Sequence, residues 1–206
     1  MNKFIRRYWK PIVFTLSLML FLFIVKLLLK EQVEVFDTTI YNVIAKIQCV
    51  PLTYIFRFLS FLCSTWFILF STILIMIFCK NKKAGFYIGL NVLICVLLNQ
   101  GLKLVFARNR PIDINLIIEN GYSFPSGHSM VSLAFYGFFI YIIAHMNLKK
   151  SKKIIYCSLL ALLTLLIGIS RIYLGVHFAS DVIGGFALSM AYLIIYISIF
   201  YKKIEI

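Results

Sequence analysis

Residues 12–29 read IVFTLSLMLFLFIVKLLL, and Lys26 is the one charged residue in this run. The run is long enough to cross the hydrocarbon core of a bilayer, for which an α-helix needs about 20 residues. Four basic residues precede it, but no small-residue cleavage site follows it. The segment is therefore predicted to be a first transmembrane helix that is retained, and not a signal peptide.

The remainder of the chain has the same apolar character. Of its 206 residues, 62% are hydrophobic and 14% are charged. A soluble core of this size has no room for so much apolar surface, so part of the solvent must be lipid. The chain is predicted to be a single all-α integral membrane domain, 1–206, built as a bundle of six transmembrane helices. These spans are expected at 11–29, 54–79, 86–106, 128–146, 154–173 and 180–201.

The first long loop, residues 30–51, carries a different pattern. Apolar residues recur there at helical spacing, namely Val33, Phe36, Ile40, Val43 or Ile44, and Ile47. This spacing predicts an amphipathic, interfacial helix that lies on the membrane surface in the first outer loop. A partly buried loop helix has the same pattern and remains the alternative.

The formal net charge is +14, which on a polar domain would indicate a nucleic-acid binder. Here most of the 21 Lys and Arg residues lie in short segments between the apolar runs. Six spans place the N-terminus, the 80–83 turn, the 149–153 turn and the C-terminal tail on one side. Positive residues favour the cytoplasmic side of a membrane. Both termini are therefore predicted to be cytoplasmic, and no nucleic-acid partner is expected.

Polar residues gather at helix ends on the opposite, outer side. One group ends the third span, a second opens the fourth, and a third joins the fifth span to the sixth. By the predicted topology, all three lie at one level of the bundle. They are Lys103 with Arg110–Pro111, then Pro125–Ser126–Gly127–His128, and finally Ser170–Arg171 with His177 and Asp181.

The cations Lys103, Arg110 and Arg171 lie at membrane depth with few carboxylates to pair with. Each one alone is explained by snorkelling to the interface. Three together repel one another unless an anion binds between them, and a guanidinium fork matches phosphate oxygens. Ser126 and Gly127 precede the fourth helix, where free backbone N–H groups favour the same anion, although an ordinary N-cap turn has the same sequence. A phosphate-binding site is therefore predicted.

Two of the three histidines lie beside this site. His177 and Asp181 are four residues apart and share a helix face. Asp181 is expected to bind one ring nitrogen of His177, so that the other nitrogen keeps a lone pair for attack on phosphorus. His128 is expected to protonate the leaving oxygen and then deprotonate the attacking water. His145 is assigned no chemistry. A lone His–Asp pair is more often structural, but the neighbouring cations favour a catalytic interpretation here.

Other phosphatase chemistries fit the composition poorly. Two-metal hydrolysis needs clustered carboxylates and histidines, and the chain has seven acidic residues in all. A metal-independent reaction without a cofactor is therefore predicted. Most of the five cysteines lie in or at the edge of apolar runs, and none is followed by Arg six residues later as in a cysteine-phosphatase loop. They are interpreted as small core residues.

The three polar groups together resemble the signature of the type 2 phosphatidic acid phosphatase family, whose site is shared with vanadium haloperoxidases and some bacterial acid phosphatases. That signature reads K-x6-RP, PSGH and SR-x5-H-x3-D, and every position is matched in order between residues 103 and 181. The resemblance implies a phosphohistidine route, with His177 as the nucleophile and His128 as the general acid. The short chain is similar to the compact bacterial members, which include undecaprenyl diphosphate phosphatases and phosphatidylglycerophosphate phosphatases.

The predicted function is hydrolysis of a lipid phosphomonoester or diphosphate headgroup at the outer face of a bacterial cell membrane. Undecaprenyl diphosphate, phosphatidylglycerophosphate and phosphatidic acid are the candidate substrates. The alternative is a phosphotransferase that passes the phosphoryl group from His177 to another lipid or to a sugar. A non-enzymatic lipid carrier would not need the histidine and cation set, and a small lipid-embedded chain is a poor match for a haloperoxidase.

Overall fold

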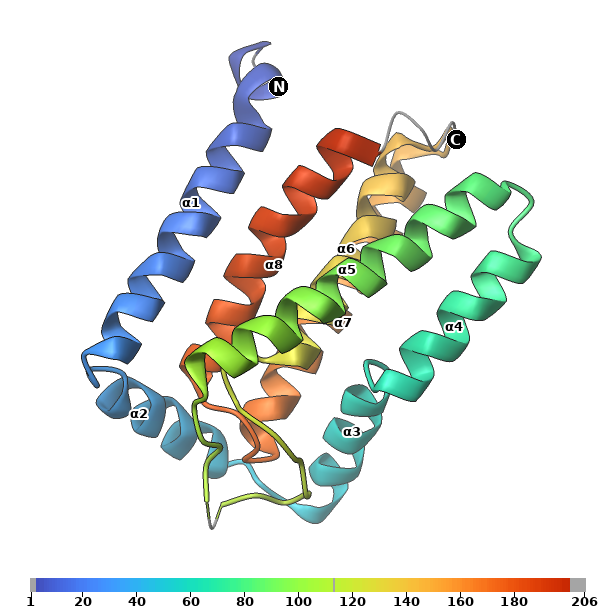
Figure 1. Ribbon diagram of the computed structural model, residues 1–206. Coiled ribbons are helices and arrows are strands. Elements are labelled where there is room, and N and C mark those ends of the chain that lie inside the picture. Colours follow the sequence, from blue (N-terminus) through green and yellow to red (C-terminus); the bar gives the residue numbers. More distant parts are fainter. Residues whose placement is uncertain (1–2, 113, 201–206) are drawn as a thin grey trace.

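The structure is a computed structural model that describes residues 3–112 and 114–200, with side chains described from Tyr8 onward. These residues form an all-helical bundle (Figure 1). Its helices are α1 Lys3–Leu29, α2 Glu34–Ala45, α3 Val50–Phe61, α4 Thr65–Phe78, α5 Lys82–Phe106, α6 Gly127–His145, α7 Lys150–Tyr173 and α8 Ala179–Phe200.

Five of these helices are each long and apolar enough to cross a membrane, namely α1, α5, α6, α7 and α8. The helices α3 and α4 pass the same test together, as a sixth span that bends by 45°. The six-span, all-α membrane bundle predicted from the sequence is thus confirmed. The ends of the other spans agree to within four residues, except that α1 begins eight residues before the predicted start, at Lys3, and that residue 201 of the last predicted span lies outside the described residues.

The second predicted span, 54–79, is wrong in its detail, because it is not one continuous helix. It begins earlier, at Val50, and is interrupted between Phe61 and Thr65. The cause is local: the Ser64 hydroxyl accepts a hydrogen bond from the Phe67 N–H at 3.3 Å and starts α4 as a new N-cap. At this bend, α3 turns away from the axis of α4. It lies at the end of the bundle that carries the polar motifs (Figure 1).

The predicted interfacial helix is present as α2, which lies across one end of the bundle (Figure 1). Its apolar residues divide between two faces. Ile40 and Ile44 pack against a cluster at the junction of α7 and α8, whereas Phe36 and Val43 are exposed. The helix is therefore partly buried against the bundle and partly open to its surroundings, so each of the two sequence interpretations describes one of its faces.

The centre of the bundle is formed by α6 and α8, which hold many of the buried side chains. Small residues allow α8 to approach the start of α6 closely. A Cβ atom added at Gly185 would lie 2.9 Å from the Ser126 carbonyl oxygen. On the other side of α8, Phe21 and Ile24 of α1 pack with Phe124 and Ala187.

The last turns of α5 and α7 and the first turns of α6 and α8 lie at the same end of the bundle, together with α2 (Figure 1). The segment between α5 and α6 crosses this end. It starts at Ala107, whose left-handed φ of 45° ends α5. Residues that are far apart in the sequence are thereby brought to one place.

Candidate active site

His177 lies in the short turn between α7 and α8, and its side chain is buried. Gly175 makes this turn possible, because its φ is +68° and an added Cβ atom would lie only 2.1 Å from the Ile114 carbonyl oxygen. The His177 Nδ1 atom is 3.4 Å from Asp181 Oδ2, in the first turn of α8. The Phe178 N–H donates to the same oxygen at 2.9 Å. Asp181 therefore fixes both the turn and the ring.

The other ring nitrogen, Nε2, is 3.1 Å from Nη1 of Arg110. An arginine can only donate, so Nε2 is the acceptor and the proton of a neutral ring is on Nδ1, facing Asp181. Burial lowers the pKa of His177 well below its usual value near 6.5, and the charges of Arg171, Arg110 and Lys103 lower it further. The imidazole is therefore neutral at pH 7 and carries a lone pair on Nε2.

Two of the predicted cations are held by backbone carbonyl groups of the α5–α6 segment. Lys103 Nζ donates to the Tyr122 carbonyl oxygen at 2.7 Å. Arg110 donates to Gly121 at 2.9 Å through Nε and to Asn120 at 3.1 Å through Nη2. Burial lowers the pKa of Arg110 from its ordinary value, but a guanidinium remains charged at any physiological pH.

The third predicted cation, Arg171, is more deeply placed, with 1% of its side chain exposed. It donates to the Ser60 hydroxyl of α3 and forms an ion pair with Glu119. Its Nε atom has no hydrogen-bond partner among the described residues. The same Glu119 carboxylate is 4.0 Å from Arg110. A single acidic side chain therefore lies between two of the predicted phosphate ligands.

The Pro125–Ser126–Gly127–His128 motif opens α6, as predicted. Both polar groups of Ser126 are already used: its N–H donates to the Asp181 carbonyl oxygen at 3.1 Å and its hydroxyl caps the helix. Ser126 does not line the cavity described below, whereas Gly127 and His128 do. A Cβ atom at Gly127 would lie 3.0 Å from Asn99 Oδ1. Gly127, with the free N–H groups of the first helical turn, is thus better placed than Ser126 to contact an anion.

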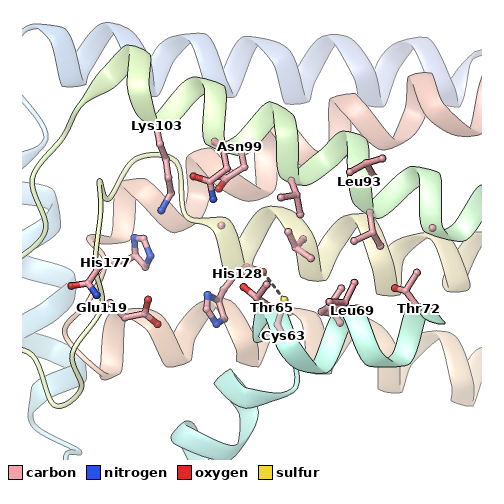
Figure 2. A pocket seen from close by; sticks show the side chains of 18 of the residues that line it. Cys63, Thr65, Leu69, Thr72, Leu93, Asn99, Lys103, Glu119, His128 and His177 are labelled. Atoms are coloured by element: carbon pink, nitrogen blue, oxygen red, sulfur yellow. Dashed lines mark hydrogen bonds between the residues drawn. The ribbon is translucent and has the colours of Figure 1, made fainter. Parts of the chain in front are cut away.

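A cavity of about 440 Å³ is lined by several of these groups, but not by Arg171. Figure 2 shows Lys103, Glu119, His128 and His177 around one end of it. The other end extends between α4 and α5, where the lining is mainly apolar and includes Ile68, Leu69, Leu93 and Val96. Nothing in the described residues brings three His, Cys, Asp or Glu side chains close enough to hold a metal ion. The cavity combines a cationic end beside two histidines with an apolar arm.

Three polar residues of this region were missed by the sequence interpretation of the site. Glu119 and Ser60 contact Arg171, and Asp37 of α2 contacts Arg108. For Glu119, the sequence contained a usable signal. It is one of only seven acidic residues and follows several cations in the sequence, so an ion pair with one of them could have been predicted. No local pattern distinguished Asp37 or Ser60, which reach the site only through the fold.

The fold and the site together define a multi-pass membrane protein with a buried neutral histidine facing a cluster of cationic side chains. The sequence model of the PAP2 superfamily matches residues 84–205. The chain therefore belongs to the PAP2 superfamily, and the resemblance seen in the three motifs is confirmed.

Individual relatives agree with this assignment. The chain is 45% identical over 96 residues to phosphatidylglycerophosphatase B of Bacillus subtilis, a match that covers 46% of this chain and 47% of that protein. It is 29% identical over 190 residues to undecaprenyl-diphosphatase of Sulfolobus acidocaldarius, covering 89% and 87% of the two chains.

Two solved structures have the same fold. One is the crystal structure of the transmembrane PAP2 type phosphatidylglycerolphosphate phosphatase of Bacillus subtilis, with a TM-score of 0.80, 30% identity, and coverage of 92% of this chain and 97% of that one. The other is LpxE of Aquifex aeolicus, with a TM-score of 0.63, 26% identity, and coverage of 79% and 95%.

Proposed function

We propose that the protein is a lipid phosphate phosphatase that works through a phosphohistidine intermediate on His177. The observation that carries this proposal is the surroundings of the His177 ring. Asp181 faces Nδ1, and Nε2 points toward Arg110 at the cationic end of the cavity. A neutral nitrogen beside cations is suited to attack a phosphorus atom whose oxygens those cations hold.

In the first step, the Nε2 lone pair attacks phosphorus and the bond from phosphorus to the leaving oxygen breaks. His128, which lines the same cavity and is in its protonated form at the start of the reaction, gives its proton to that oxygen. In the second step, a water molecule gives its proton to His128 and attacks the phosphohistidine. The N–P bond then breaks, inorganic phosphate leaves, and both histidines return to their starting state.

The cations stabilise the charge on the three equatorial oxygens during both steps. Lys103 and Arg110 line the cavity directly. Arg171 is reached through Glu119, so this carboxylate must move away from Arg171 when a phosphate binds. Arg110 likewise exchanges its contact with Nε2 for a phosphate oxygen, which keeps the guanidinium beside the reacting atom throughout.

The apolar arm of the cavity supports a lipid as the substrate. A free sugar phosphate gains nothing from the lining between α4 and α5, whereas a hydrocarbon chain there is removed from water. The relatives named above act on phosphatidylglycerophosphate and on undecaprenyl diphosphate. We propose that the substrate of this chain is a lipid of the same class, with a terminal phosphomonoester or diphosphate.

The proposed reaction takes place on the non-cytoplasmic side. The basic turns 80–83 and 149–153 lie at the end of the bundle opposite the site (Figure 1), as the positive-inside rule requires for a cytoplasmic end. Lys3, Arg6, Arg7 and the tail residues Lys202 and Lys203 belong to the same prediction but lie outside the described side chains. In a background with the five native cysteines replaced by Ala, since Cys49 is exposed, an impermeant maleimide should label Asn115→Cys in intact cells and Asn147→Cys only after permeabilisation. The reverse pattern would place the site inside.

The test of the activity is a substrate panel on purified protein, with phosphatidylglycerophosphate, undecaprenyl diphosphate and phosphatidic acid. His177→Ala should abolish phosphate release, whereas His145→Ala should not, because His145 is exposed at the far end of the bundle. Release should also survive EDTA. Label that appears on a second lipid or sugar in place of inorganic phosphate would show a phosphotransferase, and wild-type release by His177→Ala would remove the proposed nucleophile.

A further inference from the structure

Arg108 lies between two buried carboxylates that come from opposite ends of the sequence. Its Nη1 atom is 2.6 Å from Asp181 Oδ1, and its Nη2 atom is 2.8 Å from Asp37 Oδ2. The guanidinium also stacks on the Phe178 ring, 4.1 Å from the ring centroid. Arg108 is not part of the signature motifs, yet it contacts the residue that orients His177.

Among the described residues, the hydrogen-bond partners of the Asp37 carboxylate, Arg108 and Ser180, both lie at this junction. It lies on α2 between two exposed neighbours, Phe36 and Thr38, but only 2% of its own surface is exposed. The Ser180 N–H donates to Oδ1 at 2.7 Å, and the Ser180 hydroxyl donates to Oδ2 at 2.7 Å. Burying a carboxylate in a helix at the membrane surface is costly, and its full set of partners shows a built interaction.

The two oxygens of Asp181 have separate partners as a result. Oδ1 accepts from Arg108, while Oδ2 accepts from the Phe178 N–H and faces His177. The carboxylate therefore cannot rotate without breaking a charge-assisted hydrogen bond. Because Arg108 pairs with both Asp37 and Asp181, it neutralises the Asp181 charge only in part. The remaining negative charge of Asp181 stabilises positive charge on the His177 imidazole.

We propose that Asp37 and Arg108 are positioning residues of the reaction: they hold Asp181 against His177, and Asp37 offsets the Arg108 charge that would otherwise neutralise Asp181. This inference rests on the proposed role of His177 as the nucleophile. The ring becomes positively charged when Nε2 attacks phosphorus, so the charge left on Asp181 acts directly on the rate of that step.

The charges around His177 make this offset necessary. The ring is in contact with one carboxylate, Asp181, while cations approach it from the other elements packed around it. The groups that face it or share its cavity are Arg110, Lys103, Arg171, Glu119 and His128. The cations already disfavour the protonated form of His177. Removing one charge at Asp37 or Arg108 should therefore shift the pKa of His177 measurably.

The two ends of the pair should shift the pH profile in opposite directions. In Asp37→Asn, the neutral amide no longer offsets the guanidinium, so the full positive charge of Arg108 acts on Asp181. His177 then becomes less basic, and the acid limb of kcat/KM moves to lower pH. In Arg108→Met, Asp181 loses its cation, and the limb moves to higher pH. In both variants, kcat should fall about tenfold or more with KM nearly unchanged, as for other groups that orient a catalytic side chain.

The matched control is Glu34→Gln, which removes a charge from the exposed side of the same helix and should leave the profile unchanged. Combining Asp37→Asn with Arg108→Met should bring the limb back toward the wild-type position, because the added and removed charges cancel. Shifts in the same direction for both single variants, or kcat within twofold of wild type in both, would overturn the proposal.

A loss of folding is separated from a loss of positioning by Arg108→Lys, which keeps the charge but cannot bridge two carboxylates with one fork. Positioning predicts a lower kcat at unchanged KM for this variant, and a wild-type kcat overturns the proposal. Failure of the proposed function has a different signature, since His177→Ala would then remain active whatever the Asp37 variants do.

Discussion

Glu119 occupies the cation cluster in the structure, and its replacement by Gln is expected to strengthen phosphate binding. The carboxylate pairs with Arg171, is 4.0 Å from Arg110, and is 29% exposed. A phosphate that binds Arg171 must first displace it. A charge-assisted hydrogen bond contributes about 1.5–3 kcal/mol, and part of this returns when the freed carboxylate is hydrated. A net cost of about 1.4 kcal/mol corresponds to a tenfold weaker affinity for phosphate.

Glu119→Gln should therefore bind orthovanadate or inorganic phosphate about tenfold more tightly than wild type. The same variant leaves the buried Arg171 charge without its partner, so the ligand-free protein should be less heat-stable. Both effects can be read from thermal unfolding in detergent across a titration of phosphate. Glu34→Gln, which removes the same charge at an exposed position away from the site, is the control for overall charge. Weaker anion binding by Glu119→Gln would refute the reasoning, because the carboxylate would then assist the phosphate instead of competing with it.

Three further predictions follow from single features. Because the pKa of His177 is lowered well below 6.5, the acid limb of kcat/KM, along which His177 becomes protonated, should lie below pH 6.5; an acid limb above pH 7 would contradict it. Ser64→Ala removes the cap that starts α4 and should cost about 1 kcal/mol of stability, seen as a lower Tm. Gly175→Ala forces a Cβ atom against the Ile114 carbonyl oxygen at a positive φ, so it should displace His177 and abolish activity, whereas Gly101→Ala, which meets no atom within 4 Å, should be tolerated.

The sequence predicted the spans well because hydropathy acts over about 20 residues and averages out local detail. The same averaging concealed the break between α3 and α4. Ser64 interrupts the helix through one side-chain hydrogen bond, and the residues on both sides of it remain apolar. The break is important for the site, since it places Ser60 against Arg171.

The candidate site could be predicted where the residues have fixed spacing. His177 and Asp181 are four residues apart, and their contact was predicted from the sequence, although His177 lies in the turn before α8 and not on the helix itself. Arg108 pairs with Asp37 across 71 positions, and no periodicity connects two such residues. Ser126 was expected to bind phosphate from its place before α6, but its groups are used within the fold. From the sequence alone, a polar side chain that bonds within the fold cannot be distinguished from one that binds a ligand. The distinction requires its hydrogen-bond partners in the structure.

The most direct test of the account is to trap the covalent intermediate. His128→Ala lacks the group that deprotonates water, so the second step should slow more than the first when a diphosphate provides a good leaving group. Brief mixing with a lipid diphosphate labelled in the terminal phosphate, followed by alkaline quenching and peptide mapping, should place an acid-labile phosphoryl group on residue 177. Phosphate release in the wild type without any labelled protein in this variant, or a label on another residue, would contradict the central claim.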